Sequence, residues 1–263
     1  MLSLGRVKGL SSQVARRLRR PAPPVHQHPG LSHLGTPYGG WYFTDDESLR
    51  GGVVISAGLG EDASFDIELA QRLGCRLVIV DPTPRAISHY QEIQRRLGNV
   101  ATDPYRSGGK QPVSAYSLNG FDPSSLTLVD RALASTDGAV RLYPPANADH
   151  VSYSITDYQH KRARMGDFIE VQAVTYRQLL DEHLDGYAPA LIKLDIEGAE
   201  LEVLPQVLEQ PPLQILVEFD ELNMGDRASV RDWKALHGEL TSAGFVVAHT
   251  DSINFTYVHR SLY

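Results

Sequence analysis

Short, largely apolar runs alternate with amphipathic segments along most of this chain. Such runs, bounded by polar or turn residues, are typical of buried parallel strands. They occur at residues 53–55, 77–80, 126–129, 191–194, 213–217, 245–248 and 253–258. Apolar residues spaced three or four positions apart predict helices near 64–70, 84–97, 176–183, 201–208 and 230–243. Only about four residues separate the last two strands, so we expect these two to be antiparallel.

This order of elements predicts an α/β fold, a doubly wound, mostly parallel seven-stranded sheet with a reversed C-terminal edge strand. Ligands of such sheets bind outside the carboxyl ends of the strands, where the direction of winding switches. We expect residues 51–263 to form this domain. Residues 1–50 are predicted to be a basic N-terminal extension followed by a linker or cap. A hairpin is also predicted from strands at 126–134 and 139–143.

Charge is distributed unevenly along the sequence. The 263 residues carry a net charge of −7. Residues 1–20 hold six basic and no acidic residues, so the remainder carries −13, which is −7 minus +6. Leucines and valines lie between these bases, and the segment is either an amphipathic helix on an anionic membrane or a disordered basic tail. The acidic remainder argues against nucleic-acid binding.

Membrane and redox signals are few. The sequence has no run of about 18 apolar residues, so no membrane-spanning helix is predicted. Its single cysteine, Cys75, excludes an intrachain disulfide and a cysteine-based zinc cluster. We therefore expect a cytoplasmic protein, with peripheral membrane contact if residues 1–20 form the amphipathic helix.

A glycine-rich loop follows the first predicted strand. Gly58 and Gly60 allow positive φ and a close approach of a ligand to the backbone. Their spacing fits the dinucleotide fingerprint, and it fits equally well the looser loop that binds S-adenosylmethionine. Glu61 and Asp62 place negative charge where a pyrophosphate would sit, which disfavours a dinucleotide. The sequence therefore indicates a nucleotide-like cofactor and leans towards one without phosphates.

Asp81 ends the second predicted strand and precedes Pro82. An acidic residue at this position can accept hydrogen bonds from both ribose hydroxyls of either cofactor. We expect Asp81→Ala to weaken cofactor binding and to change the melting temperature of the unliganded protein little, because a strand tip faces the crevice. Acidic residues also end two later strands, at Asp195 and Glu218.

The stretch from Ile192 to Glu200, IKLDIEGAE, resembles the K-[IL]-D-[IV]-E-G-A-E signature of FkbM-family methyltransferases. Further similar pieces follow the same order in the chain: 132–138, 151–154, Glu218 and 254–257. The sequence departs from the family pattern at Ser56, where an acidic residue is common, and at Leu59–Gly60, where asparagine is common. The resemblance covers roughly residues 50 to 260.

The resemblance implies a class I methyltransferase-like Rossmann fold and methyl transfer from S-adenosylmethionine to a hydroxyl oxygen of a small molecule, such as a sugar, glycan or natural product. It implies catalytic roles for Asp195 and Glu197. Expected cofactor contacts are Ser56, Gly58, Gly60, Asp81, Pro82, Ala132 and Asp195, and expected acceptor contacts are Ser152, Tyr153 and Glu218. If a divalent metal such as magnesium takes part, its ligands are expected to be Asp195, Glu197 and Glu218.

Other interpretations of these residues stay open at this stage. An NAD-dependent oxidoreductase would account for the glycine loop but not for the signature around Asp195. A non-catalytic nucleotide-binding module would account for both without turnover. In a purely structural interpretation, Glu197 and Glu200 stabilise the N-terminus of the helix that follows them.

Overall fold

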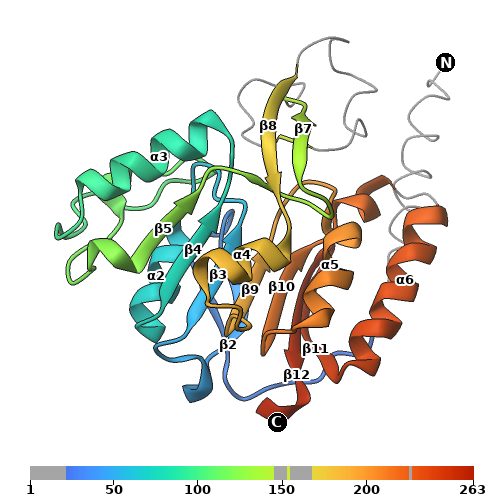
Figure 1. Ribbon diagram of the computed structural model, residues 1–263. Helices are drawn as coiled ribbons and strands as arrows, with labels where there is room; N and C mark the ends of the chain where they lie inside the picture. Colours follow the sequence, from blue (N-terminus) through green and yellow to red (C-terminus); the bar gives the residue numbers. More distant parts are fainter. Residues whose placement is uncertain (1–21, 145–152, 155–167, 225–226) are drawn as a thin grey trace, which may run out of the picture.

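The central element is a seven-stranded sheet with the spatial order β11-β12-β10-β9-β3-β4-β5 (Figure 1). The computed structural model describes residues 22–144, 153–154, 168–224 and 227–263. The basic segment 1–20 lies outside this part of the chain, so its predicted membrane contact stays a prediction. The strands of the sheet are β3 (Val53–Ala57), β4 (Arg76–Val80), β5 (Leu126–Val129), β9 (Leu191–Leu194), β10 (Gln214–Glu218), β11 (Phe245–Asp251) and β12 (Asn254–His259).

The pairing of the strands confirms the predicted doubly wound fold. β5, β4, β3, β9 and β10 are parallel to one another, whereas β12 is antiparallel to both β10 and β11. The reversed C-terminal strand therefore lies one position in from the edge, and β11 forms the edge itself. Winding proceeds from β3 to one side and resumes from β9 on the other, so the topological switch point lies between these two strands.

Helices cover both faces of the sheet (Figure 1). α4 (Tyr176–His183), α5 (Glu200–Glu209) and α6 (Arg227–Ser242) pack on one face, and α2 (Ser64–Leu73) and α3 (Pro84–Arg95) on the other. Alternate strand residues face opposite layers, as the pleat of a strand requires: Ile192 and Leu194 join the first layer, and Leu191 joins the second. Burial on both faces explains why these strands are almost continuously apolar.

A short hairpin precedes the sheet, in the region predicted as linker or cap. β1 (Leu31–Leu34) and β2 (Trp41–Thr44) are antiparallel, and Phe43 is completely buried in the α2-side core. The Gln214 side chain donates to the Thr44 carbonyl at 2.6 Å and accepts from the Thr44 N–H at 2.9 Å. The predicted boundary at residue 51 stays a prediction, but this hairpin packs as part of the same core.

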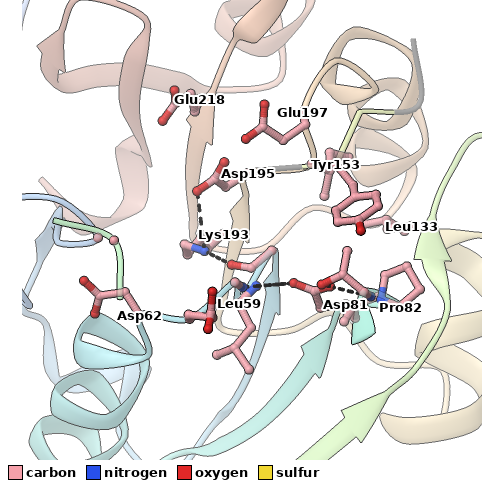
Figure 2. A pocket seen from close by; sticks show the side chains of 18 of the residues that line it. Leu59, Asp62, Asp81, Pro82, Leu133, Tyr153, Lys193, Asp195, Glu197 and Glu218 are labelled. Atoms are coloured by element: carbon pink, nitrogen blue, oxygen red, sulfur yellow. Dashed lines mark hydrogen bonds and ion pairs between the residues drawn. The ribbon is translucent and has the colours of Figure 1, made fainter. Parts of the chain in front are cut away.

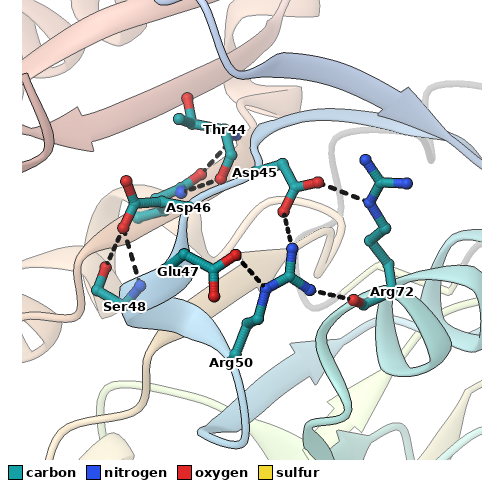
Figure 3. Close-up of polar contacts among 8 residues, drawn as sticks. Thr44, Asp45, Asp46, Glu47, Ser48, Arg50 and Arg72 are labelled. Carbon is teal, nitrogen blue, oxygen red and sulfur yellow. Dashed lines mark hydrogen bonds and ion pairs between the residues drawn. The ribbon is translucent and has the colours of Figure 1, made fainter.

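A polar cluster joins the end of the hairpin to α2 (Figure 3). The Asp45 carboxylate lies 2.6 Å from Nε of Arg72 and 3.3 Å from a terminal nitrogen of Arg50. Arg50 also donates to the Arg72 carbonyl at 2.5 Å, at the carboxyl end of the helix. These contacts fix where the chain enters β3, and therefore where the glycine loop begins.

The predicted hairpin at 126–134 and 139–143 is wrong in its pairing. β6 (Ala132–Leu133) and β7 (Gly138–Leu142) do not pair with each other, because β8 (Ile169–Val174) lies between them in a three-stranded sheet. β6 is two residues long and is too short to form a ladder of its own, whereas β8 can pair along its length with β7.

Within the described residues, no helix is both long and apolar enough to cross a membrane.

Candidate active site

A cavity of about 410 Å³ opens at the carboxyl ends of β3, β4, β9 and β10 (Figure 2). It lies at the topological switch point, where sheets of this kind bind their ligands. Most of the predicted site residues line it: Gly58, Gly60, Asp81, Pro82, Ala132, Tyr153, Asp195, Glu197 and Glu218. The structure therefore brings together residues that are more than 150 positions apart in the chain.

The glycine loop needs glycine for both steric and conformational reasons. Gly58 has φ +88° and Gly60 has φ +57°, in the region that residues with a side chain rarely adopt. A Cβ at Gly58 would lie 2.0 Å from the Asp195 carbonyl oxygen. The loop after β3 is thus pressed against the end of β9, and this contact sets the floor of the cavity.

Asp81 holds the glycine loop from the end of β4. Its Oδ2 accepts hydrogen bonds from the N–H groups of Leu59 at 2.9 Å and Gly60 at 3.0 Å. Its Oδ1 accepts from the backbone N–H and the hydroxyl of Thr83. Because an ionised carboxylate has about four acceptor positions, the protein itself uses them all. Asp81 is 6% exposed and lines the cavity, so it borders the crevice with a carboxylate that is already hydrogen-bonded within the protein.

Two N–H groups at the N-terminus of α2, those of Ala63 and Ser64, also donate to the protein's own groups. The Asp62 carboxylate accepts from the Ser64 N–H at 3.0 Å and from the Thr36 hydroxyl at 2.6 Å. The Ala63 N–H donates to the Tyr116 hydroxyl at 2.9 Å. These partners occupy donors that a helix N-terminus would otherwise offer to an anion.

Lys193 lies beneath the cavity and is 4% exposed. Its Nζ donates to the Gly58 carbonyl and lies 4.0 Å from Oδ2 of Asp195 (Figure 2). It also lies over the Trp41 ring, 5.7 Å from the centroid. Among the described residues that line the cavity, it is the only basic one. The buried Lys193 side chain therefore links the Gly58 carbonyl of the glycine loop to the Asp195 carboxylate.

Four carboxylates gather at the end of the cavity formed by β9 and β10: Asp195, Glu197, Glu218 and Asp220. Glu197 sits in a tight turn with φ +56°, and the Ser154 hydroxyl donates to its carbonyl at 2.6 Å. Figure 2 shows Glu197 projecting into the same space as Asp195 and Glu218. Ligand atoms of Asp195, Glu197 and Asp220 lie within 4.8 Å of one another. Of the predicted metal ligands, Glu218 is not in this group, and Asp220 stands in its place.

Comparison with protein families now bears on these residues. The model of the FkbM methyltransferase domain matches residues 58–247, from the glycine loop to β11. This span is most of the chain and contains both the loop and the carboxylates. The chain belongs to the FkbM methyltransferase family.

Other comparisons with known proteins are weaker. A solved chain from a fibrillarin/Nop5p complex is 9% identical, with a TM-score of 0.40, and the match covers 80% of this chain and 73% of that one. A similarity at this level does not bear on the function of the FkbM methyltransferase. Comparison with curated proteins finds no significant match.

One predicted contact of this FkbM methyltransferase, Ser56, does not line the cavity. Ser56 is completely buried within β3, and its contact with a cofactor stays a prediction that this placement does not support. Ser152 lies outside the described residues, and the nearby serine that reaches the site is Ser154.

Several cavity residues of the FkbM methyltransferase were not among the predicted site residues, and three of them have side chains suited to a role in the site. Tyr38 lines the cavity from the turn between β1 and β2, Lys193 from β9 and Asp220 from the segment after β10. Lys193 stands within the family signature, and Asp220 is a second acid beyond a strand end, so both had a signal in the sequence. Tyr38 had only its position before a run of glycines and aromatics.

Burial and mutual repulsion raise the pKa values of the cavity's carboxyl groups. Burial, together with the charges of Asp220 and Asp81, raises the pKa of Asp195 to about 6, although Lys193 opposes the shift. Burial and the charges of Asp195 and Asp220 raise the pKa of Glu218 to about 8. Burial also raises the pKa of Asp220. Crowding of these carboxyl groups therefore disfavours their simultaneous ionisation, and a positive charge placed among them would relieve the repulsion.

The raised pKa of Glu218 leads to a prediction about stability. Its carboxyl group moves from an ordinary pKa of 4.5 to about 8, so the folded protein binds more protons than the unfolded chain between these values. Stability is then lost as the pH rises through this window. We expect Glu218→Gln to flatten the fall in melting temperature between about pH 5 and pH 8. Thermal unfolding of both proteins without ligand tests this, and parallel profiles would contradict it.

Proposed function

We propose that this FkbM methyltransferase transfers a methyl group from S-adenosylmethionine to a hydroxyl oxygen of a small molecule such as a sugar, glycan or natural product. The observation that carries the proposal is the state of the glycine loop. Its Leu59 and Gly60 N–H groups already donate to Asp81, and two N–H groups at the adjoining N-terminus of α2 donate to Asp62 and Tyr116. The loop therefore has few donors left for a pyrophosphate.

The charge of the cavity supports the same cofactor. S-adenosylmethionine has a positive sulfonium and ammonium and no phosphate, whereas NAD carries a negative pyrophosphate. The cavity is lined by carboxylates, and its lysine already contacts the Gly58 carbonyl and lies beside Asp195. The two basic residues near Glu61 are directed to it: Arg85 lies 3.5 Å and Lys110 4.0 Å from its carboxylate. An NAD-dependent oxidoreductase is the weaker candidate on these grounds.

Asp195 and Glu197 suit different reactants: Asp195 the cofactor, and Glu197 the methyl acceptor. Asp195 directly follows β9 beside the glycine loop, and this position supports our assignment of its carboxylate to the positive end of the cofactor. Glu197 lies farther along the turn with its side chain directed into the cavity, which supports its assignment as the group that accepts the proton of an acceptor hydroxyl. S-adenosylmethionine supplies an electrophilic methyl group, and the protein's part is to align the acceptor oxygen with it and to remove the proton.

The size and lining of the cavity support a small acceptor. Its volume of about 410 Å³ lies within the range of small-molecule sites. Tyr38 and Tyr153 also line it, and rings with a hydroxyl suit a ligand that has both apolar and polar parts. We propose that the acceptor enters between these tyrosines and Glu197.

Thermal stability with each cofactor tests the proposal. S-adenosylmethionine at about 100 times its Kd should stabilise the fold by about 2.7 kcal/mol. For a chain of this size, that corresponds to a rise in melting temperature of roughly 5–10 °C. NAD at the same concentration should give no rise. Formation of S-adenosylhomocysteine with a panel of sugar and natural-product acceptors then tests the transfer, and stabilisation by NAD alone would refute the proposal.

A metal requirement stays a separate prediction. Asp195, Glu197 and Asp220 come close enough to hold a divalent cation such as magnesium, but exposed acidic groups often come together without one. If such a metal takes part, EDTA should abolish methyl transfer and magnesium should restore it. Undiminished activity in EDTA would exclude an essential, readily removable metal.

A further inference from the structure

A buried carboxylate outside the cavity holds the turn that carries Glu197. Glu200 is the first residue of α5 and is completely buried. One of its oxygens accepts the Ile196 N–H at 2.9 Å, and the other accepts the Gly198 N–H at 2.9 Å. The two amides lie on either side of Glu197, so a single side chain fixes both ends of that residue.

The turn needs such support because its backbone is strained. Glu197 has φ +56°, and Gly198 has φ +103°. A left-handed conformation is unfavourable for a residue with a side chain, so it persists only where surrounding contacts enforce it. The two hydrogen bonds to Glu200 enforce it from within the fold, and the Ser154 hydroxyl bonded to the Glu197 carbonyl does so from the cavity side.

Glu221, in the segment after β10, contacts the start of α5 next to Glu200. It follows Asp220 and is 6% exposed, and its Oε1 accepts the Leu201 N–H at 3.1 Å. Its Oε2 is buried without a donor partner. Burial and the charge of Glu221 raise the pKa of Glu200 well above its ordinary value.

We propose that Glu200 is a positioning residue that holds Glu197 in its reactive orientation. The inference rests on the proposed function, in which Glu197 accepts the proton of the acceptor hydroxyl. Glu200 does not itself touch the cavity, and its role is to accept the two flanking N–H groups at once. Glu200 also lies in the first turn of α5, where an acidic side chain suits the helix dipole, so its contacts with the turn add to a role at the helix N-terminus.

Glu200→Gln tests the role with little change in volume. An amide has one acceptor oxygen, so at least one of the two N–H groups loses its partner. We expect kcat per folded molecule to fall roughly 10- to 100-fold through misplacement of Glu197. The Kd for S-adenosylmethionine should change less than about threefold, since Asp195 stays in β9's register. Glu202→Gln removes an exposed charge from the same helix turn and should leave kcat and Kd unchanged.

Combination with Glu197→Gln separates positioning from general stabilisation. If Glu200 acts through Glu197, the double variant should be no more than about threefold slower than Glu197→Gln alone. Independent, additive losses would overturn the proposal. So would an unchanged kcat per folded molecule in Glu200→Gln together with a lower melting temperature, because that result makes the residue structural only.

Hydrogen exchange tests the contact without any reaction. In the ligand-free protein, the amide of Ile196 or Gly198 should exchange at least about tenfold faster in Glu200→Gln than in the parent or in Glu202→Gln. Unchanged exchange at both amides would overturn the proposal. If the parent protein transfers no methyl group but the exchange result holds, the proposed function fails while Glu200 is still shown to hold the turn.

Discussion

Replacing Glu197 with glutamine is expected to lower kcat by about 10²- to 10⁴-fold, the usual contribution of a general base. The amide has nearly the same shape but cannot accept the proton of the acceptor hydroxyl. The side chain projects into the cavity, so we expect the melting temperature to fall by only a few degrees at most, on the scale of about 1 kcal/mol for a surface hydrogen bond. Single-turnover methyl transfer and thermal unfolding measure the two effects separately.

Asp195→Asn serves as the matched comparison for Glu197→Gln. Because Asp195 lies beside the glycine loop, its loss should appear first as a weaker Kd for S-adenosylmethionine. A Glu197→Gln protein that melts far below the parent but keeps its specific activity when folded would show that Glu197 is structural. Equal losses of cofactor affinity in both variants would contradict the division of roles.

Asp81→Ala is expected to weaken S-adenosylmethionine binding roughly 10- to 100-fold, at about 1.4 kcal/mol per tenfold. The structure changes the reason for this expectation. Alanine leaves the Leu59 and Gly60 N–H groups without their acceptor, and each unpaired buried donor costs about 1–3 kcal/mol. The unliganded melting temperature should therefore fall as well, contrary to the expectation from the sequence. Calorimetric titration and thermal unfolding together measure both effects.

Asp81→Asn separates the two ways in which this residue could act. The amide oxygen of asparagine can still accept the two loop N–H groups, but its nitrogen cannot accept from Thr83. If Asp81 acts by holding the loop, asparagine should recover most of the cofactor affinity lost in the alanine variant. Affinity as low in both variants would instead favour a direct bond from the carboxylate to the ribose.

Patterns within single segments predicted most of the fold. The apolar runs at 53–55 and 191–194 become the two strands at the switch point, because burial on both faces leaves the same signature wherever a strand lies in a parallel sheet. The strand-end acids Asp195 and Glu218 were predicted to meet, since carboxyl ends of parallel strands share one edge. The position of each strand and of the acid at its end could therefore be predicted from the periodicity of the segment itself and from the order of the segments in the chain.

Pairings between distant segments were not predictable in the same way. β8 lies between β6 and β7, and nothing in residues 132–142 indicates that these strands pair with a strand about 30 positions later instead of with each other. The carboxylate of Asp81 was assigned to a ligand, because a sequence shows an acceptor but not the N–H groups that reach it. Ser56 was assigned to the cavity for the same reason, since the direction of a side chain depends on the fold around it.

The position of β12 has a consequence for how the chain folds as it is synthesised. β12 is the last strand in the described sequence, yet it pairs with both β10 and β11. Until residues 254–259 have left the ribosome, β10 presents an unpaired edge and β11 has no place in the sheet. Exposed strand edges of this kind recruit other chains. Nascent or C-terminally shortened molecules that lack β12 are therefore expected to depend on chaperones, even though all the residues of the cavity are already present.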